Sequence, residues 1–118
     1  MGDSFRDLIV WQRAIQLSTA IYRFTADFPK EEIYGLSSQL RRASVSVASN
    51  IAEGYGRGSK GEYKQFLGIA RGSNFEVQTQ LTIAKELGFG AMGKLETTEQ
   101  LSHEVGKMLG AILGKLST

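Results

Sequence analysis

Residues 41–88 read RRASVSVASNIAEGYGRGSKGEYKQFLGIARGSNFEVQTQLTIAKELG and hold two helical patterns separated by a glycine-rich turn, GYGRGS. Residues 35–54 repeat apolar or small residues at spacings of three and four, which is the period of one helix face. Residues 60–87 repeat the same pattern, with Ser59 and Glu62 spaced as a capping box and with Gly88 and Gly90 as stop signals. The two faces hold Leu36, Leu40, Ala43, Val47, Ile51 and Gly54, then Tyr63, Phe66, Ala70, Asn74, Val77, Leu81 and Ala84.

Two further helices are predicted outside this stretch. The first covers residues 5–28, with Ser4 and Asp7 as its cap and Pro29 as its stop. The last covers residues 97–116, with Thr97 or Thr98 as its cap. Their apolar faces hold Val10, Ala14, Leu17, Ile21, Phe24 and Phe28, then Leu101, Val105, Met108, Ile112 and Leu116.

Four amphipathic helices joined by short links predict an all-α, up-down-up-down four-helix bundle in a single domain, residues 1–118. A long two-helix coiled coil fits less well, because Pro29 and the glycines of residues 54–58 and 88–93 interrupt it.

The composition excludes several kinds of functional site. The 118 residues include no Cys, which excludes disulfides, thiolate metal sites and a cysteine nucleophile. His103 is the only histidine and position 100 is Gln, so a di-iron bundle site with two Glu-x-x-His pairs is also excluded. We expect no metal and no cofactor. The sequence also lacks a secretory leader and an apolar stretch of roughly 18 residues, so we expect a soluble, cytoplasmic protein.

Positive charge is concentrated in the middle of the chain. The net charge is +2, but residues 35–72 carry six basic and two acidic groups, a local excess of four. Such a segment predicts a positive surface that binds phosphates, although a solvated helix face with glutamate partners is the alternative for any single residue. The candidate nucleic-acid-binding residues are Arg41, Arg42, Arg57, Lys60, Lys64 and Arg71.

Three polar residues of this region are predicted to form a structural network rather than a catalytic site. Asn50 and Glu53 belong to the NIAEG segment, and Asn74 falls on the apolar face of the following helix. Since no second carboxylate or histidine stands at a supporting spacing, we interpret them as a buried hydrogen-bond network in which Glu53 pairs with an arginine. A ribonuclease relying on His103 is a weaker alternative, and GYGRGSKG lacks the spacing of a phosphate-binding loop, so we interpret it as a turn.

Each helix carries more apolar surface than one bundle core requires. A wide core is one explanation, and self-association through second faces is the other. The second faces also include Ile69, Ile83 and Leu87 on the third predicted helix and Leu109 and Leu113 on the fourth. The candidate residues of an oligomer interface are Trp11, Ile15, Tyr22, Val45, Ala48 and Ala52.

The motifs SVASNIAEGYGR at 46–57 and IARGSNFE at 69–76, with FRDLIVWQRAIQL and YGLSSQLRRAS, give the chain a family resemblance. It resembles the four-helix-bundle proteins encoded within intervening sequences of bacterial 23S ribosomal RNA genes, and more distantly the accessory protein of diversity-generating retroelements. The resemblance implies a homopentamer, no known catalytic activity and a role with RNA or another nucleic acid.

These observations predict a non-enzymatic, homo-oligomeric scaffold that binds structured RNA through backbone electrostatics. The alternative is a scaffold for another protein, such as a reverse transcriptase, with no direct nucleic-acid contact. Steep weakening of RNA binding by salt would favour the first of these hypotheses.

Overall fold

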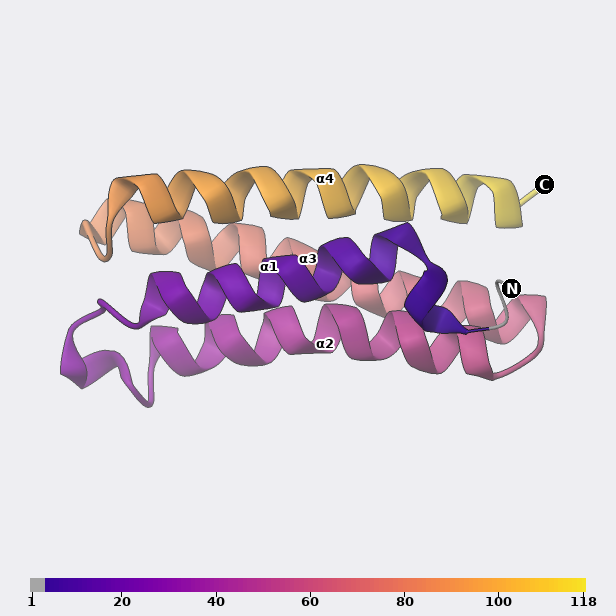
Figure 1. The fold of residues 1–118 in the computed structure, drawn as a ribbon, viewed down its shortest axis with the longest axis horizontal. Coiled ribbons are helices and arrows are strands. Elements are labelled where there is room, and N and C mark those ends of the chain that lie inside the picture. The colour runs from indigo at the N-terminus through magenta and orange to yellow at the C-terminus, as the bar shows by residue number, and fades with distance from the viewer. Residues whose placement is uncertain (1–3) are drawn as a thin grey trace.

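The computed structural model describes residues 4–118 and confirms the all-α, up-down-up-down four-helix bundle. All four helices run along the long axis, and the described chain, residues 4–118, begins and ends at the end of the bundle where α2 passes into α3 (Figure 1). Two short 3₁₀ turns, η1 and η2, complete the described chain. The elements are η1 (Phe5–Asp7), α1 (Ile9–Thr25), η2 (Lys30–Glu32), α2 (Leu36–Gly56), α3 (Lys60–Leu87) and α4 (Met92–Leu116).

The bundle core is filled by the apolar faces that the helical spacing predicts for the first three helices. Large side chains that are completely or almost completely buried come from all four helices, so every helix contributes to one continuous core. They are Leu17, Ile21, Phe24, Leu40, Val47, Ile51, Leu67, Val77, Leu81, Val105 and Leu109.

The α2–α3 hairpin forms as its turn signals predict. The Ser59 hydroxyl accepts a hydrogen bond of 3.2 Å from the Glu62 backbone N–H, which confirms the capping box. Close packing at the end of α2 depends on Gly54, because a Cβ at this position would lie 2.6 Å from the Cβ of Phe66. Gly88 ends α3 with a left-handed φ of 73°, a conformation that glycine adopts without steric cost.

Three helix boundaries differ from the prediction. The helix of the first segment ends at Thr25 rather than Phe28, and Ser4 caps the turn η1 rather than α1. The last helix begins at Met92, so Thr97 and Thr98 lie inside it. Thr98 is fully buried and donates a hydrogen bond of 2.6 Å to the Leu95 carbonyl, which satisfies its hydroxyl within the helix.

The predicted core face of the last helix is rotated from the real one. Leu109, which the spacing assigned to a second face, is fully buried, whereas Leu101 and Met108 are only half-buried. One glycine of this helix accounts for the rotation: Gly106 lies against α3, where a Cβ would be 3.1 Å from the Asn74 side-chain nitrogen. On α3, Leu67 is a core residue that the predicted face omitted.

Candidate functional site

An apolar groove runs between the outer sides of α1 and α2. It has a volume of about 250 Å³, and most of its lining comes from the predicted oligomer-interface residues. Ile15 and Val45 are 40% and 43% exposed, while Ala48 is buried beneath them and forms part of the floor. The lining residues are Trp11, Ile15, Ser18, Val45, Ala48, Ser49 and Ala52.

The groove is bordered by a rigid aromatic side chain at one end. Trp11 packs edge-to-face on Phe5, with ring centroids 5.2 Å apart, so the η1 turn fixes the indole in place. Ser18 and Ser49, which the sequence analysis did not select, lie among the apolar residues. Their small side chains keep the groove open. Helical spacing could have predicted both serines, because Ser18 follows Ile15 by three residues and Ser49 follows Val45 by four, which places each pair on one helix face.

Tyr22 extends the exposed apolar strip along α1, seven residues beyond Ile15. Its ring is 46% exposed, and the guanidinium of Arg41 stacks on it at 4.8 Å from the centroid. The Arg41 Nε also donates a hydrogen bond of 2.9 Å to the hydroxyl of the buried Thr25. Arg41 therefore fastens α2 to α1, in addition to any role in binding phosphate.

The structure does not place the six candidate cations on one side of the chain. Arg41 faces α1, whereas Arg42 lines a groove between α2 and α3. Arg57 pairs with Glu53 at 2.8 Å and lies over the Phe66 ring. Lys60, Lys64 and Arg71 follow one another along α3, where Lys60 Nζ donates to the Thr118 carbonyl at 3.4 Å and Arg71 lies 5.5 Å from the centroid of Phe75.

Arg71 points away from the α2–α3 groove that Arg42 lines. The α2–α3 groove contains Glu76, and Arg71 lies five residues before Glu76, or roughly 140° away around the helix. The predicted basic surface of residues 41–71 is thus distributed around the bundle in a single chain.

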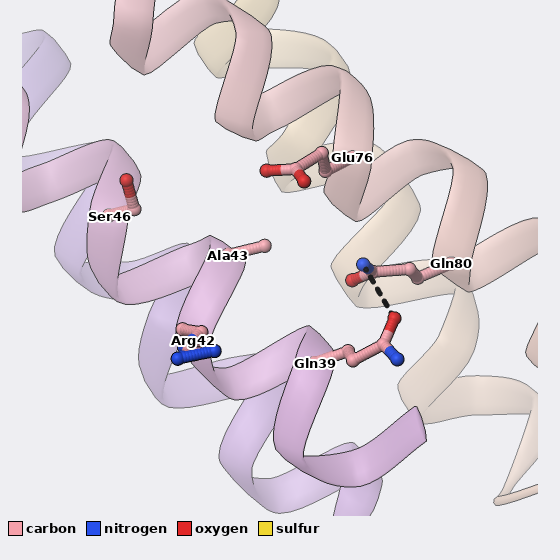
Figure 2. Close-up of a pocket in the computed structure, with 6 residues that line it drawn as sticks. All are labelled: Gln39, Arg42, Ala43, Ser46, Glu76 and Gln80. Atoms are coloured by element: carbon pink, nitrogen blue, oxygen red, sulfur yellow. Dashed lines mark hydrogen bonds between the residues drawn. The ribbon is translucent and has the colours of Figure 1, made fainter. Parts of the chain in front are cut away.

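The groove between α2 and α3 is polar, with a volume of about 370 Å³. Figure 2 shows Glu76 and Gln80 of α3 reaching toward α2, with the Gln80 amide nitrogen at 3.5 Å from the Gln39 side-chain oxygen. The side-chain oxygen of Gln80 is buried without a hydrogen-bond partner. This groove was not predicted, because its members are ordinary polar residues without a motif.

The predicted polar network is divided into separate contacts, and Glu53 is not part of its buried portion. Asn50 donates to the Ser46 carbonyl at 2.8 Å, and the Ser46 hydroxyl is 2.9 Å from that of Ser73, which links α2 to α3. Asn74 is fully buried and donates to the Ser102 carbonyl at 2.9 Å, while the Ser102 hydroxyl donates to Asn74 at 2.8 Å.

Glu53 instead lies at the surface, with a side chain that is 52% exposed. Its ion pair with Arg57 confirms the expected arginine partner and corrects the expected burial. Because the pair is exposed, water screens it and its contribution to stability is small. Asn74 therefore fixes the register of α3 and α4, whereas the half-buried Asn50 bonds Ser46 of its own helix. Glu53 belongs to the surface of the α2–α3 turn.

The structure gives His103 a position on the exposed side of α4. It lines a shallow cavity of about 200 Å³ together with Gln78, Thr82 and Glu99. Within residues 4–118, no cluster of three or more His, Asp or Glu side chains could hold a metal ion, and no helix is long and apolar enough to span a membrane. The GYGRGSKG segment forms the α2–α3 turn, with Gly58 at a φ of 82°.

One titratable group in the described chain has a clearly shifted pKa. Burial of the Tyr63 phenol, with a smaller contribution from nearby Tyr55, raises the pKa of Tyr63 above its ordinary value of 10.0. The two rings lie edge-to-face with centroids 6.0 Å apart, beside the α2–α3 turn.

We expect alkaline titration to detect Tyr63 as a late-ionising tyrosine. The neutral phenol is favoured in the folded state, so its contribution to stability is present below pH 10.0 and is lost as the pH rises through the raised pKa. Near-ultraviolet absorbance should show this late step, and Tyr63→Phe should remove it. Tyr34→Phe is the matched control, because it removes the same hydroxyl from a tyrosine that is 94% exposed. An unchanged late step in Tyr63→Phe would contradict the assignment.

The sequence pattern of one protein family covers almost the whole bundle. The family is described as 23S rRNA-intervening sequence protein, and it matches residues 6–111. This chain belongs to that family. The match includes α1, α2, α3 and most of α4, so every surface described above lies within the family domain or at its end.

A solved structure of another protein has a similar fold. It is the crystal structure of a protein with unknown function from the S23 ribosomal protein family of Bacteroides thetaiotaomicron VPI-5482. The likeness has a TM-score of 0.79 at 21% identity and covers 89% of this chain and 98% of that one. At this identity the likeness establishes the fold. Among curated proteins, none matches this sequence.

Proposed function

We propose that this protein is a non-enzymatic scaffold whose copies assemble through the α1–α2 groove and whose assembly binds structured RNA. The observation that carries the proposal is the groove itself. Its apolar side chains remain at the surface although the chain already has a complete core that all four helices share. Contiguous apolar surface of this kind is typical of a protein interface.

A closed ring requires two different contact surfaces, because each copy meets one neighbour with one surface and the next neighbour with the other. The first surface is the α1–α2 groove with Tyr22. A second apolar surface lies on α3, where Ile69, Ile83 and Leu87 are 45%, 44% and 58% exposed. Their spacings of fourteen and four residues place them on one helix face. This pair of surfaces supports a ring, and the family resemblance favours five copies.

The RNA-binding part of the proposal depends on charge and on the family. The name of the family associates it with intervening sequences of 23S rRNA. A single chain carries only a net charge of +2, but a ring sums the fields of its copies. Phosphate contacts by lysine and arginine release counterions, so the predicted binding is electrostatic and tolerant of RNA sequence.

Two measurements test the proposal. Sedimentation should give a mass several times that of the 12.9 kDa chain, with five copies expected. RNA binding, measured with a structured RNA over a range of salt concentrations, should weaken steeply as salt rises. A monomer at micromolar concentration would overturn the assembly. Absent or salt-insensitive RNA binding would overturn the RNA role, and a protein recovered with the native complex would then favour the protein-scaffold alternative.

A further inference from the structure

The outer side of the α3–α4 pair carries a row of cations that is not confined to residues 41–71. The two helices are antiparallel, and two hydrogen bonds fix their register: Asn74 donates to the Ser102 carbonyl and Lys60 donates to the Thr118 carbonyl. In this register Arg71 lies level with Lys107, and Lys64 lies level with Gly114. We call Lys64, Arg71 and Lys107 the α3–α4 basic row.

Helical spacing places the three cations at the same edge of the two helices. Lys64, Arg71 and Gln78 are spaced by seven residues and so share one side of α3. Gln78 and His103 line one shallow cavity between α3 and α4, which shows that this side of α3 borders α4. Lys107 follows His103 by four residues and therefore continues the same edge of α4. The cations face a common strip of surface.

The backbone of α4 is open along this strip. Gly110 lies between the levels of Arg71 and Lys64, and neither Gly110 nor Gly114 has an atom within 4 Å of the position that a Cβ would take. No side chain of these two residues separates the cations of α3 from those of α4. A phosphodiester backbone can therefore approach the helix surface between them.

Three carboxylates close in sequence to the row are engaged elsewhere, and Glu99, which lines the cavity with Gln78 and His103, lies two turns of α4 before Lys107. Glu53 pairs with Arg57, Glu62 accepts a hydrogen bond from the capping Ser59, and Glu104 pairs with Arg13 of α1 at 2.7 Å. Within residues 4–118, none of the ion pairs that form includes a member of the α3–α4 basic row. Its positive charge is therefore left for a partner of opposite charge.

The row also stays clear of both surfaces that the proposed ring would use. Arg71 lies two residues after Ile69, or roughly 200° around α3, so it points away from the second apolar surface. The α1–α2 groove is on helices that the row does not touch. Assembly would leave the row exposed on every copy.

We propose that Lys64, Arg71 and Lys107 hold the phosphate backbone of RNA across the outer side of α3 and α4, from the middle of these helices toward the end of the bundle where α2 passes into α3 (Figure 1). This inference rests on the proposed RNA-binding function and gives it a location. Lys107 contributes from outside the segment that the charge distribution of the sequence selected. The strip holds a polyanion by point charges on two antiparallel helices, without reading bases.

The test compares two triple variants with the same loss of charge. One is Lys64→Gln/Arg71→Gln/Lys107→Gln, and the other is Arg23→Gln/Lys30→Gln/Lys85→Gln, whose exposed cations lie at the opposite end of the bundle. With a structured RNA, the first variant should bind at least about tenfold more weakly and reduce the slope of log K against log salt by about three. The second should change both quantities much less.

Photo-crosslinking tests the location of the RNA without changing the charge of the protein. Because the chain has no cysteine, Gly110→Cys can carry a single photo-crosslinking label, and Gly93→Cys at the other end of α4 is the control. Labelled Gly110→Cys should crosslink RNA more efficiently than labelled Gly93→Cys. Equal losses in the two triple variants, or equal crosslinking, would overturn the location while leaving RNA binding intact. A wild-type protein that binds no RNA would overturn both the location and the proposed function.

Discussion

Gly90→Ala is expected to lower the free energy of unfolding by about 2–4 kcal/mol, the sum of a backbone cost and a packing cost. Gly90 has a φ of 76°, which an L-residue with a side chain adopts only with strain. The added Cβ would overlap Cε1 of Phe24 and lie 3.0 Å from Cε1 of Phe28. Phe24 is fully buried, so its ring has no free space into which it can move.

Gly88→Ala separates the two costs. Gly88 has nearly the same φ of 73°, but nothing lies within 4 Å of the position of its Cβ. This variant should lose about 1 kcal/mol, from the backbone alone. Denaturant unfolding at equal protein concentration checks the pair. Similar losses for the two variants would show that the α3–α4 turn does not depend on contact with the aromatic cluster of Phe24, Phe28 and Phe89.

Local rules were sufficient to predict α2 and α3 because each signal is a short-range interaction. The Ser59 capping box and the left-handed Gly88 satisfy orphan backbone groups within a few residues, so the sequence around them determines the outcome. Helical spacing also selected the residues of a second apolar face on α1 and α2, and most of the lining of the α1–α2 groove comes from them. Ile15 and Val45 fall outside the core face by helical spacing alone, and the packing of the bundle leaves them exposed, whereas Trp11 is half-buried against the edge of the core.

The start and orientation of α4 could not be predicted in this way. Gly88, Gly90 and Gly93 together indicate a break, but only the first two have a positive φ, and Gly93 lies in the first turn of the helix. The rotation of α4 depends on tertiary contact: Gly106 permits close approach to Asn74, and the reciprocal hydrogen bonds between Asn74 and Ser102 then fix which side faces the core. Neither contact is visible in the spacing of apolar residues.

The distribution of charge was also beyond local reasoning. Arg41 and Arg42 are adjacent in sequence but lie about 100° apart on α2, so one contacts α1 and the other contributes to the α2–α3 groove. Lys107 joins Arg71 only through the antiparallel register of α3 and α4. A count of charges along the chain identifies a basic segment, whereas a basic surface depends on which helices are neighbours.

Val45→Lys is expected to dissociate the assembly, with a loss of about 3 kcal/mol or more at each interface, or on the order of a hundredfold in affinity. Val45 is 43% exposed in the single chain, so a lysine there is tolerated by the isolated bundle and also favours the helix. In a ring the ammonium would be buried against apolar side chains without a partner, which is unfavourable. Sedimentation should show a mass near 12.9 kDa.

The same variant separates assembly from net charge as the cause of RNA binding. Val45→Lys adds a positive charge, so a mechanism that depended only on the charge of the single chain would strengthen RNA binding slightly. The proposed mechanism predicts the opposite, because separate copies no longer combine their basic rows against one RNA. Ile33→Lys adds the same charge at a residue that is 59% exposed and outside the groove, and it should retain both assembly and binding. Stronger RNA binding by a monomeric Val45→Lys protein would show that the scaffold is not needed to gather the charge.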